Sequence, residues 1–234
     1  MKRRKFLHMS SLLGSAAAVF PSELFSYPVT KNRLQVGFIG TGLRGQGMMR
    51  LTTHRQDVDI PAICDIDDGM INKALTLLKK AGRPEPTVYN KGDEDFRNLV
   101  KNEDLDAVYI ATPWEWHHPM AVAAMKAGKH VGTEVPAALT VADCWDLVNT
   151  SEKTGRFCMI MENVCYRRDV MAVLNMVRKG LFGELLHCQG GYQHDLRRVK
   201  FNDGIKPYGG GVEFGEKGYS EAKWRTNHSV NRNG

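Results

Sequence analysis

Three glycines near the start of the chain have the spacing of a phosphate-binding turn. Gly40, Gly42 and Gly45 follow the apolar run 34–39 and precede a segment with helical spacing. This is the strand–turn–helix context that a dinucleotide-binding turn requires. The first glycine permits a tight turn, the second lets the backbone approach a pyrophosphate, and the third lets the helix pack close to the strand. The N–H groups at the start of the helix would then face the phosphates.

An acidic residue at the end of the next apolar run supplies a group that can bind the ribose. Asp65 directly follows the run 58–64 and stands about 20 residues after the last motif glycine, which is the expected spacing. A carboxylate there can accept hydrogen bonds from the adenosine ribose and would repel a 2′-phosphate, so it favours NAD over NADP. The glycine motif alone is a weak signal, but together with its strand context and the acid it predicts an NAD site.

Strand-length apolar runs alternate with helical patterns up to about residue 162, and these elements must position the groups above. Strands are expected at 34–39, 58–64, near 89, 106–111, 130–132 and 157–161, and helices at about 45–51, 71–78, 93–100, 118–127 and 140–153. The alternation predicts an α/β fold, a doubly wound parallel sheet of the Rossmann type, over residues 31–162. Ligands in such sheets bind at the carboxyl ends of the strands. Those ends are Asp65, Thr112–His117, Glu134 and Glu162–Asn163.

Three further segments carry a family resemblance. They are Ala111-Thr112-Pro113 followed by His117, then Ala127–Val131, then Glu134 and Pro136. Together with the glycine motif and Asp65, they resemble the oxidoreductase family named after glucose-fructose oxidoreductase and inositol dehydrogenase. The resemblance covers about residues 33–190.

One departure from that family is informative. The family has Glu-Lys-Pro where this chain has Glu134-Val135-Pro136. The lysine assists proton transfer at the hydroxyl that is oxidised, and valine cannot. The segments 114–117, 163–166 and 191–197 are also unusual, and together they resemble one branch, glycoside hydrolase family 109. Its members are NAD-dependent α-N-acetylgalactosaminidases that carry export signals.

The resemblance implies roles for individual residues. Positions that line the NAD site are matched by Leu43, Arg44, Asp65, Trp114, Glu115, Trp116, His117, Glu134, Val135 and Asn163. Tyr192 and Arg225 match positions that contact the sugar, which would be a terminal N-acetylgalactosamine on a small molecule or glycan. The implied mechanism is oxidation of the sugar at C3, elimination of the C1 group, addition of water and re-reduction, so that NAD is regenerated at each turnover.

This mechanism needs proton acceptors and a proton donor, and the missing lysine leaves Tyr192, His194 and His117 as the candidates. Histidine suits proton transfer because its unperturbed pKa is about 6.5. The spacing of Tyr192 and His194 places both on one face of a strand. Other interpretations stay open: His117 as a helix cap, Tyr192 as a packing residue, His194 as a surface residue, and Trp114 and Trp116 as packing anchors.

Two other functions also stay open. A dehydrogenase of the broader family would oxidise a sugar or polyol and release NADH, although it would lack the usual lysine. A non-catalytic dinucleotide- or sugar-binding protein is the third alternative.

Composition excludes several other classes. The net charge is +6, but it falls to +3 without residues 1–26, and no basic face with interleaved aromatics points to nucleic acid. The five cysteines form no C-x-x-C pair, so neither a disulfide framework nor a metal site is expected. The sequence does not decide between a monomer and a homo-oligomer.

The first 26 residues are typical of an export signal. A basic head, Lys2–Lys5, precedes the apolar stretch 6–20, which is too short and too rich in Ser and Gly to favour a stable membrane span. Arg3-Arg4-Lys5-Phe6-Leu7 resembles the twin-arginine signal, which exports folded proteins. We therefore expect a periplasmic protein, while an ordinary secretory signal is the alternative.

Residues 163–234 are expected to begin a second, substrate-binding domain. Arg168–Lys179 has helical spacing, and 183–189 reads as the start of a strand. In the family this opens an α+β domain with a mainly antiparallel sheet. Because family members are much longer, we interpret the chain as an incomplete sequence in which this domain is truncated.

Overall fold

The computed structural model describes residues 33–191 and residue 193. The segment 1–26, which we expect to be an export signal, and the three candidate residues Tyr192, His194 and Arg225 lie outside this range.

The core of the molecule is a six-stranded parallel sheet with the strand order β3-β2-β1-β4-β5-β6. The strands are β1 (Leu34–Ile39), β2 (Val58–Cys64), β3 (Thr87–Tyr89), β4 (Ala107–Ile110), β5 (His130–Thr133) and β6 (Cys158–Ile160). The helices are α2 (Leu43–Thr53), α3 (Asp68–Lys80), α4 (Phe96–Val100), α5 (Trp114–Lys126), α6 (Val141–Thr154), the 3₁₀ turn η2 (Val164–Tyr166) and α7 (Arg168–Arg178). This strand order is that of the Rossmann fold, so the predicted fold class is confirmed for this part of the chain.

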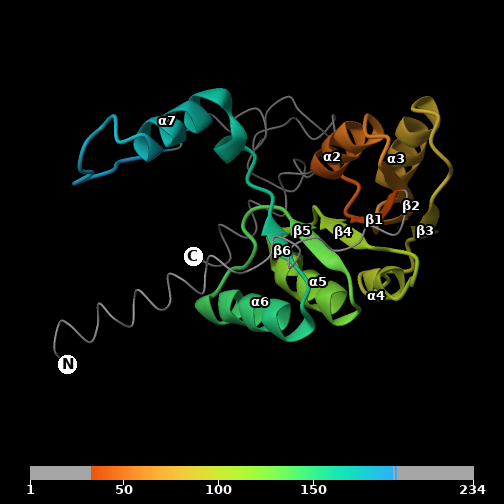
Figure 1. The fold of residues 1–234 in the computed structure, drawn as a ribbon. Helices are drawn as coiled ribbons and strands as arrows, with labels where there is room; N and C mark the ends of the chain where they lie inside the picture. Colours follow the sequence, from red (N-terminus) through yellow and green to blue (C-terminus); the bar gives the residue numbers. More distant parts are fainter. Residues whose placement is uncertain (1–32, 192, 194–234) are drawn as a thin grey trace, which may run out of the picture. The chain divides into compact units, whose positions relative to one another are not determined.

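Helices cover both faces of the sheet (Figure 1), and each face has its own apolar cluster. Under α2 and α3, the fully buried Phe38 and Ile63 pack with Met49 and Leu78. Under α4, α5 and α6, the cluster contains Phe96, Ile110, Met125 and Leu147. The central strands are buried on both sides, which explains why their sequences are continuous apolar runs rather than alternating ones.

Local signals in the sequence set several helix starts. The Asp67 side chain accepts a hydrogen bond from the Met70 N–H (3.0 Å) and caps α3, while the Thr140 hydroxyl accepts one from the Asp143 N–H (3.1 Å) and caps α6. Such side-chain caps satisfy N–H groups that the first helical turn leaves without an intrahelical partner.

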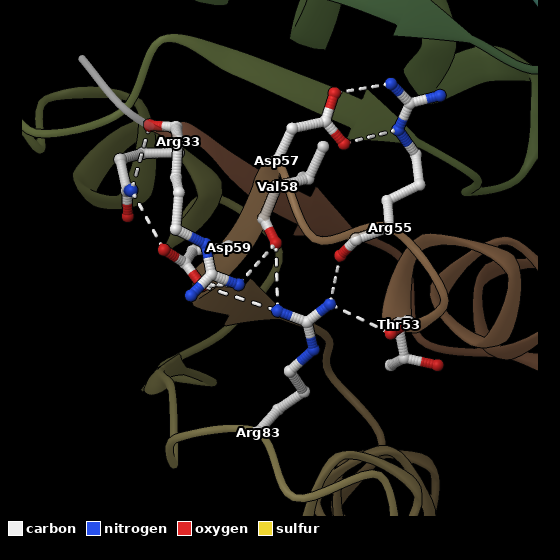
Figure 2. A network of polar contacts seen from close by, with 8 residues as sticks. Arg33, Thr53, Arg55, Asp57, Val58, Asp59 and Arg83 are labelled. Atoms are coloured by element: carbon white, nitrogen blue, oxygen red, sulfur yellow. Dashed lines mark hydrogen bonds and ion pairs between the residues drawn. The ribbon is translucent and has the colours of Figure 1, made fainter.

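A cluster of arginines and acids fixes the amino-terminal end of β2 (Figure 2). Arg83, from the connection between α3 and β3, donates to the carbonyl oxygens of Val58 (3.1 Å) and Thr53 (2.8 Å) and also to that of Arg55. Asp59 lies 2.9 Å from an Arg33 nitrogen and 3.5 Å from an Arg83 nitrogen. Because Arg83 is largely buried, this cluster holds the connection between α2 and β2 in place.

Three sequence expectations differ from the structure. α4 begins at Phe96 rather than at residue 93, because 93–95 form a turn. α5 begins at Trp114 rather than at residue 118, because the Trp116 N–H already donates to the Pro113 carbonyl (3.0 Å) and closes a first turn. The expected strand 183–189 is wrong: the segment is exposed and pairs with no strand in the described part of the chain. A strand exists only where a neighbour satisfies its backbone groups, which an apolar pattern alone cannot supply.

Of the second domain, only η2, α7 and the exposed segment after them lie within the described range. The mainly antiparallel sheet expected there therefore stays a prediction.

Candidate functional site

The glycine turn joins β1 to α2 with the geometry that its spacing predicts. Gly40 has a φ of +92°, and its N–H donates to the Cys64 carbonyl (2.8 Å). A Cβ at Gly45 would lie 2.0 Å from the Gly40 carbonyl oxygen, so any side chain there would collide with the turn. A Cβ at Gly42 would meet no atom within 4 Å. The turn is therefore closed on its protein side, and Gly42 leaves open space beside the start of α2.

That open space is part of a pocket of about 660 Å³ at the carboxyl ends of the strands. The size lies within the range of about 300–1,000 Å³ that is usual for ligand pockets. Most of the predicted cofactor-binding residues line it: Gly40, Gly42, Leu43, Arg44, Asp65, Trp114, Trp116, His117, Glu134 and Val135. Gly45 lies beneath the turn, and the exposed Glu115 and Asn163 do not line the pocket.

The sequence interpretation missed another part of the lining. The start of α3 contributes Ile66, Asp67, Gly69, Met70 and Lys73, and the loop after β3 contributes Gly92 and Asp93. The rule that ligands bind beyond the carboxyl ends of strands would have indicated the β3 loop, had it been applied to that short strand. The capping position of Asp67 would likewise have placed the start of α3 beside Asp65.

Asp65 faces the glycine turn and is held by three donors. Its Oδ2 accepts hydrogen bonds from the Thr41 N–H (2.5 Å) and the Thr41 hydroxyl (2.9 Å), and its Oδ1 accepts one from the Asp67 N–H (3.0 Å). A carboxylate has about four lone-pair sites. One site on Oδ1 therefore remains for a ligand donor, because both sites on Oδ2 are used.

An ion pair joins two sides of the pocket that are far apart in the sequence. The Arg44 Nε lies 2.6 Å from the Glu134 Oε1, so the first turn of α2 is linked to the segment after β5. The Glu134 side chain is 14% exposed and that of Arg44 is 42% exposed. Both groups are thus within reach of a ligand that extends from the glycine turn towards β5.

His117 lies at the base of the pocket and contacts two backbone carbonyls. Its Nδ1 is 2.6 Å from the Pro136 oxygen and its Nε2 is 2.8 Å from the Thr112 oxygen, and the residue is 1% exposed. Both ring nitrogens are therefore engaged with protein atoms. This arrangement favours a positioning role, tying the segment after β4 to the segment after β5, over the proton transfer that the sequence suggested.

Trp116 of α5 contacts both the apolar core and the pocket. Trp116 packs against the Phe96 ring edge-to-face, with ring centroids 6.1 Å apart, and contacts the apolar cluster on that side of the sheet. Trp116 is thus both a packing anchor and part of the pocket wall, which combines the two interpretations of the sequence.

Val135 occupies the position where the resembled family has lysine. It is 42% exposed, lines the pocket and precedes Pro136. No amine can act at this point of the site. Burial raises the pKa of the pocket-lining Cys64 thiol to about 12, so this group is not a thiolate nucleophile either.

Within residues 33–191 and 193, no cluster of His, Cys, Asp and Glu is arranged to hold a metal ion. No helix there is long and apolar enough to cross a membrane.

Family models match two parts of the chain. Residues 34–162 match the oxidoreductase family with an NAD-binding Rossmann fold, and residues 166–234 match the C-terminal domain of glycosyl hydrolase 109.

Curated relatives extend over most of the chain. An alpha-N-acetylgalactosaminidase from Tannerella forsythia is 57% identical over 205 residues, which cover 86% of this chain and 44% of the relative. A glycosyl hydrolase family 109 protein from Stenotrophomonas maltophilia is 48% identical over 239 residues, covering 100% of this chain and 52% of the relative. The chain spans about half the length of the curated relatives that it matches.

Solved structures share the fold at lower identity. A scyllo-inositol dehydrogenase from Lactobacillus casei with bound NAD(H) and scyllo-inositol has a TM-score of 0.56 at 21% identity, covering 65% of this chain and 43% of the other. A myo-inositol dehydrogenase from Lactobacillus casei in complex with NAD(H) and myo-inositol has a TM-score of 0.57 at 24% identity, covering 64% and 43%.

Proposed function

Because this chain belongs to the oxidoreductase family with an NAD-binding Rossmann fold, we propose that its pocket holds NAD. The observation that carries the proposal is the shape of the glycine turn. Gly42 lines the pocket with open space where a side chain would stand, and α2 begins at the next residue. A pyrophosphate could therefore approach the backbone and face the N–H groups of the first helical turn.

The charges beside the carboxyl ends of β2 and β3 support NAD over NADP. Among the described pocket residues that follow these two strands are three carboxylates, Asp65, Asp67 and Asp93, and the amine of Lys73. Three carboxylates outnumber the one ammonium group, so a 2′-phosphate would meet net repulsion. The remaining lone-pair site on Asp65 Oδ1 suits a ribose hydroxyl.

We further propose that the protein hydrolyses terminal α-N-acetylgalactosaminides. Supporting this are the match of residues 166–234 to the glycosyl hydrolase 109 C-terminal domain and the 57% identity to the relative from Tannerella forsythia that carries the name alpha-N-acetylgalactosaminidase. When bound, NAD supplies reversible oxidation at sugar C3, which makes elimination and water addition at C1 feasible and leaves no net redox change. NAD-dependent glycosidases are a known exception to the two-carboxylate mechanism.

The residues of this chain have separate tasks in that scheme. Arg44 and Glu134 bind and orient the cofactor between the glycine turn and β5, and His117 holds the segments on either side of it. Val135 provides no proton acceptor at the oxidised hydroxyl. The proton transfers therefore belong to Tyr192 and His194, with Arg225 binding the sugar, and these assignments rest on the sequence.

One experiment separates this function from its alternatives. The full-length protein is incubated with an aryl α-N-acetylgalactosaminide, while release of the aryl alcohol and the absorbance of NADH are followed together. We expect catalytic release without net NADH. Stoichiometric NADH would instead identify a dehydrogenase, and the absence of both signals would favour a binding protein.

Two variants then test the proton-transfer residues. Tyr192→Phe and His194→Ala should each lower turnover by about 100-fold or more, the lower end of general acid–base contributions. His187→Ala is the matched control, because it removes a histidine that is exposed and does not line the pocket. Unchanged turnover in both test variants would reject the assignments.

Export of the folded protein is part of the proposal. Its support is the Arg3-Arg4-Lys5-Phe6-Leu7 sequence followed by a short apolar stretch. A folded route suits an enzyme that acquires its cofactor in the cytoplasm. Replacing both arginines by lysine should keep the protein in the cytoplasmic fraction, and undiminished periplasmic activity would contradict twin-arginine export.

A further inference from the structure

Thr41, the second residue of the glycine turn, is fully buried and has all its polar groups bonded. Its N–H and its hydroxyl both donate to Asp65 Oδ2, at 2.5 and 2.9 Å. Its carbonyl oxygen accepts a hydrogen bond from the Gln46 side chain at 2.7 Å. The residue is 0% exposed and does not line the pocket. Thr41 therefore acts on the pocket only through other residues.

The main consequence is the orientation of the Asp65 carboxylate. Two donors from one residue fill both lone-pair sites of Oδ2, and the Asp67 N–H takes one site of Oδ1. With Oδ2 held against the turn, rotation of the carboxylate about its Cβ–Cγ bond would break two hydrogen bonds to a charged group. Such bonds are among the stronger ones in proteins. The oxygen with a remaining site, Oδ1, is thus fixed in place.

We propose that Thr41 is the positioning residue for cofactor selection: its hydroxyl holds Asp65 so that Oδ1 accepts a ribose hydroxyl and the carboxylate charge faces the place of a 2′-phosphate. This inference rests on the proposed NAD site. The role of Thr41 differs from that of the motif glycines, which shape the turn but provide no side-chain donor. The preference for NAD over NADP then depends on a buried hydroxyl that the ligand never touches.

The variant Thr41→Val tests the role of the hydroxyl, because valine has nearly the same shape and keeps the backbone N–H. Without the hydroxyl, Oδ2 retains one donor and the carboxylate can turn away from the ribose. We expect NADH to bind about tenfold more weakly, corresponding to the loss of one hydrogen bond to a charged group. NADPH binding should change less, so the ratio of the two affinities should shrink. Thr41→Ser keeps the donor and should retain both affinities.

Thr52→Val is a matched control. Thr52 is also a buried threonine, on α2, and its hydroxyl donates only to the Met48 carbonyl (3.0 Å), away from the pocket. Both affinities should equal those of the unmodified protein. If Thr41→Val does not fold, Thr41→Ala replaces it, since alanine removes the hydroxyl without placing a second methyl group beside the carboxylate.

The measurement is a titration of the full-length protein with NADH and with NADPH, followed by protein fluorescence. Unchanged affinities in Thr41→Val, or an equal loss for both cofactors, would overturn the inference while leaving the NAD site intact. No NADH binding by the unmodified protein would instead overturn the proposed function, and the inference with it.

A double substitution shows whether Thr41 works through Asp65. In an Asp65→Asn background, the further change Thr41→Val should have little additional effect on the ratio of NADH to NADPH affinity. The same loss in both backgrounds would mean that Thr41 acts by another route and would contradict the inference.

Discussion

Replacing either of two nearby glycines in α2 by alanine adds one methyl group, and the two replacements should have opposite effects on the stability of the protein. A Cβ at Gly47 would meet no atom within 4 Å, whereas a Cβ at Gly45 would lie 2.0 Å from the Gly40 carbonyl oxygen and 3.0 Å from its carbon. Both glycines are in the same helix. The variants Gly45→Ala and Gly47→Ala therefore share the same gain in helix propensity and differ in the collision.

The magnitudes follow from these distances. Gly47→Ala should raise the free energy of unfolding by about 0.5–1 kcal/mol, because alanine is favoured over glycine inside a helix. In Gly45→Ala the Cβ and the Gly40 oxygen must separate by about 1 Å or more, since Cβ contacts below 3.0 Å are essentially never found. Gly40 is itself held by its hydrogen bond to the Cys64 carbonyl (2.8 Å) and by its positive φ. Overpacking of this kind costs about 1–3 kcal/mol, so the two variants should differ by about that amount.

The assay is denaturant unfolding of both variants and the unmodified full-length protein, monitored by circular dichroism, together with NADH titration. Gly45→Ala should unfold at lower denaturant and bind NADH more weakly, because displacement of the turn also moves the N–H groups of α2. Gly47→Ala should be at least as stable as the unmodified protein and bind NADH equally well. If Gly45→Ala proved as stable as Gly47→Ala, the close contact between the helix and the turn would be refuted.

Two further predictions concern the scaffold. Arg83→Met removes the donors to the Val58 and Thr53 carbonyls and should destabilise the protein by about 1–3 kcal/mol in the same unfolding assay. Arg55→Ala, which removes an exposed ion pair with Asp57, should destabilise the protein much less, and equal losses would contradict the assigned role of Arg83. Burial and the nearby Arg156 lower the pKa of His130. Its neutral ring accepts the Phe157 N–H at Nδ1 (3.1 Å). The contribution of the neutral His130 ring to stability is therefore present above about pH 6.5 and is lost as the pH falls below that value. The thermal midpoint of His130→Gln should therefore fall less between about pH 7.5 and about pH 5 than that of the unmodified protein, and identical pH profiles would count against this account.

The parts of the site that the sequence predicted well are those encoded by neighbouring residues. The bounds of β1 and β2 agree with the apolar runs 34–39 and 58–64, because buried parallel strands need continuous apolar sequence. The spacing of the motif assigned the tight turn to Gly40 and the close helix contact to Gly45, because neither position has room for a side chain. The parallel order of the sheet then placed Asp65, Trp114 and Glu134 at one edge.

The failures arose where a partner distant in the sequence decides the outcome. The strand expected at 183–189 needed a neighbouring strand. The pocket residue Lys73 lies in a helix whose own pattern gives no indication of a ligand. For His117, the proton transfer that the residue type suggests stays a prediction, and only the structure shows that its ring nitrogens lie beside the Thr112 and Pro136 carbonyl oxygens.

By itself, the sequence determined the Rossmann fold, the place of the dinucleotide turn and the absence of a lysine at Val135, because these depend on residue type and short-range spacing. Only the tertiary structure decided how the side chains are used. It paired Arg44 with Glu134, 90 residues away, and it turned Asp65 towards Thr41. The physical reason is that hydrogen bonds and ion pairs reach only a few ångströms, so their partners are known only once the chain has brought the ends of different strands together.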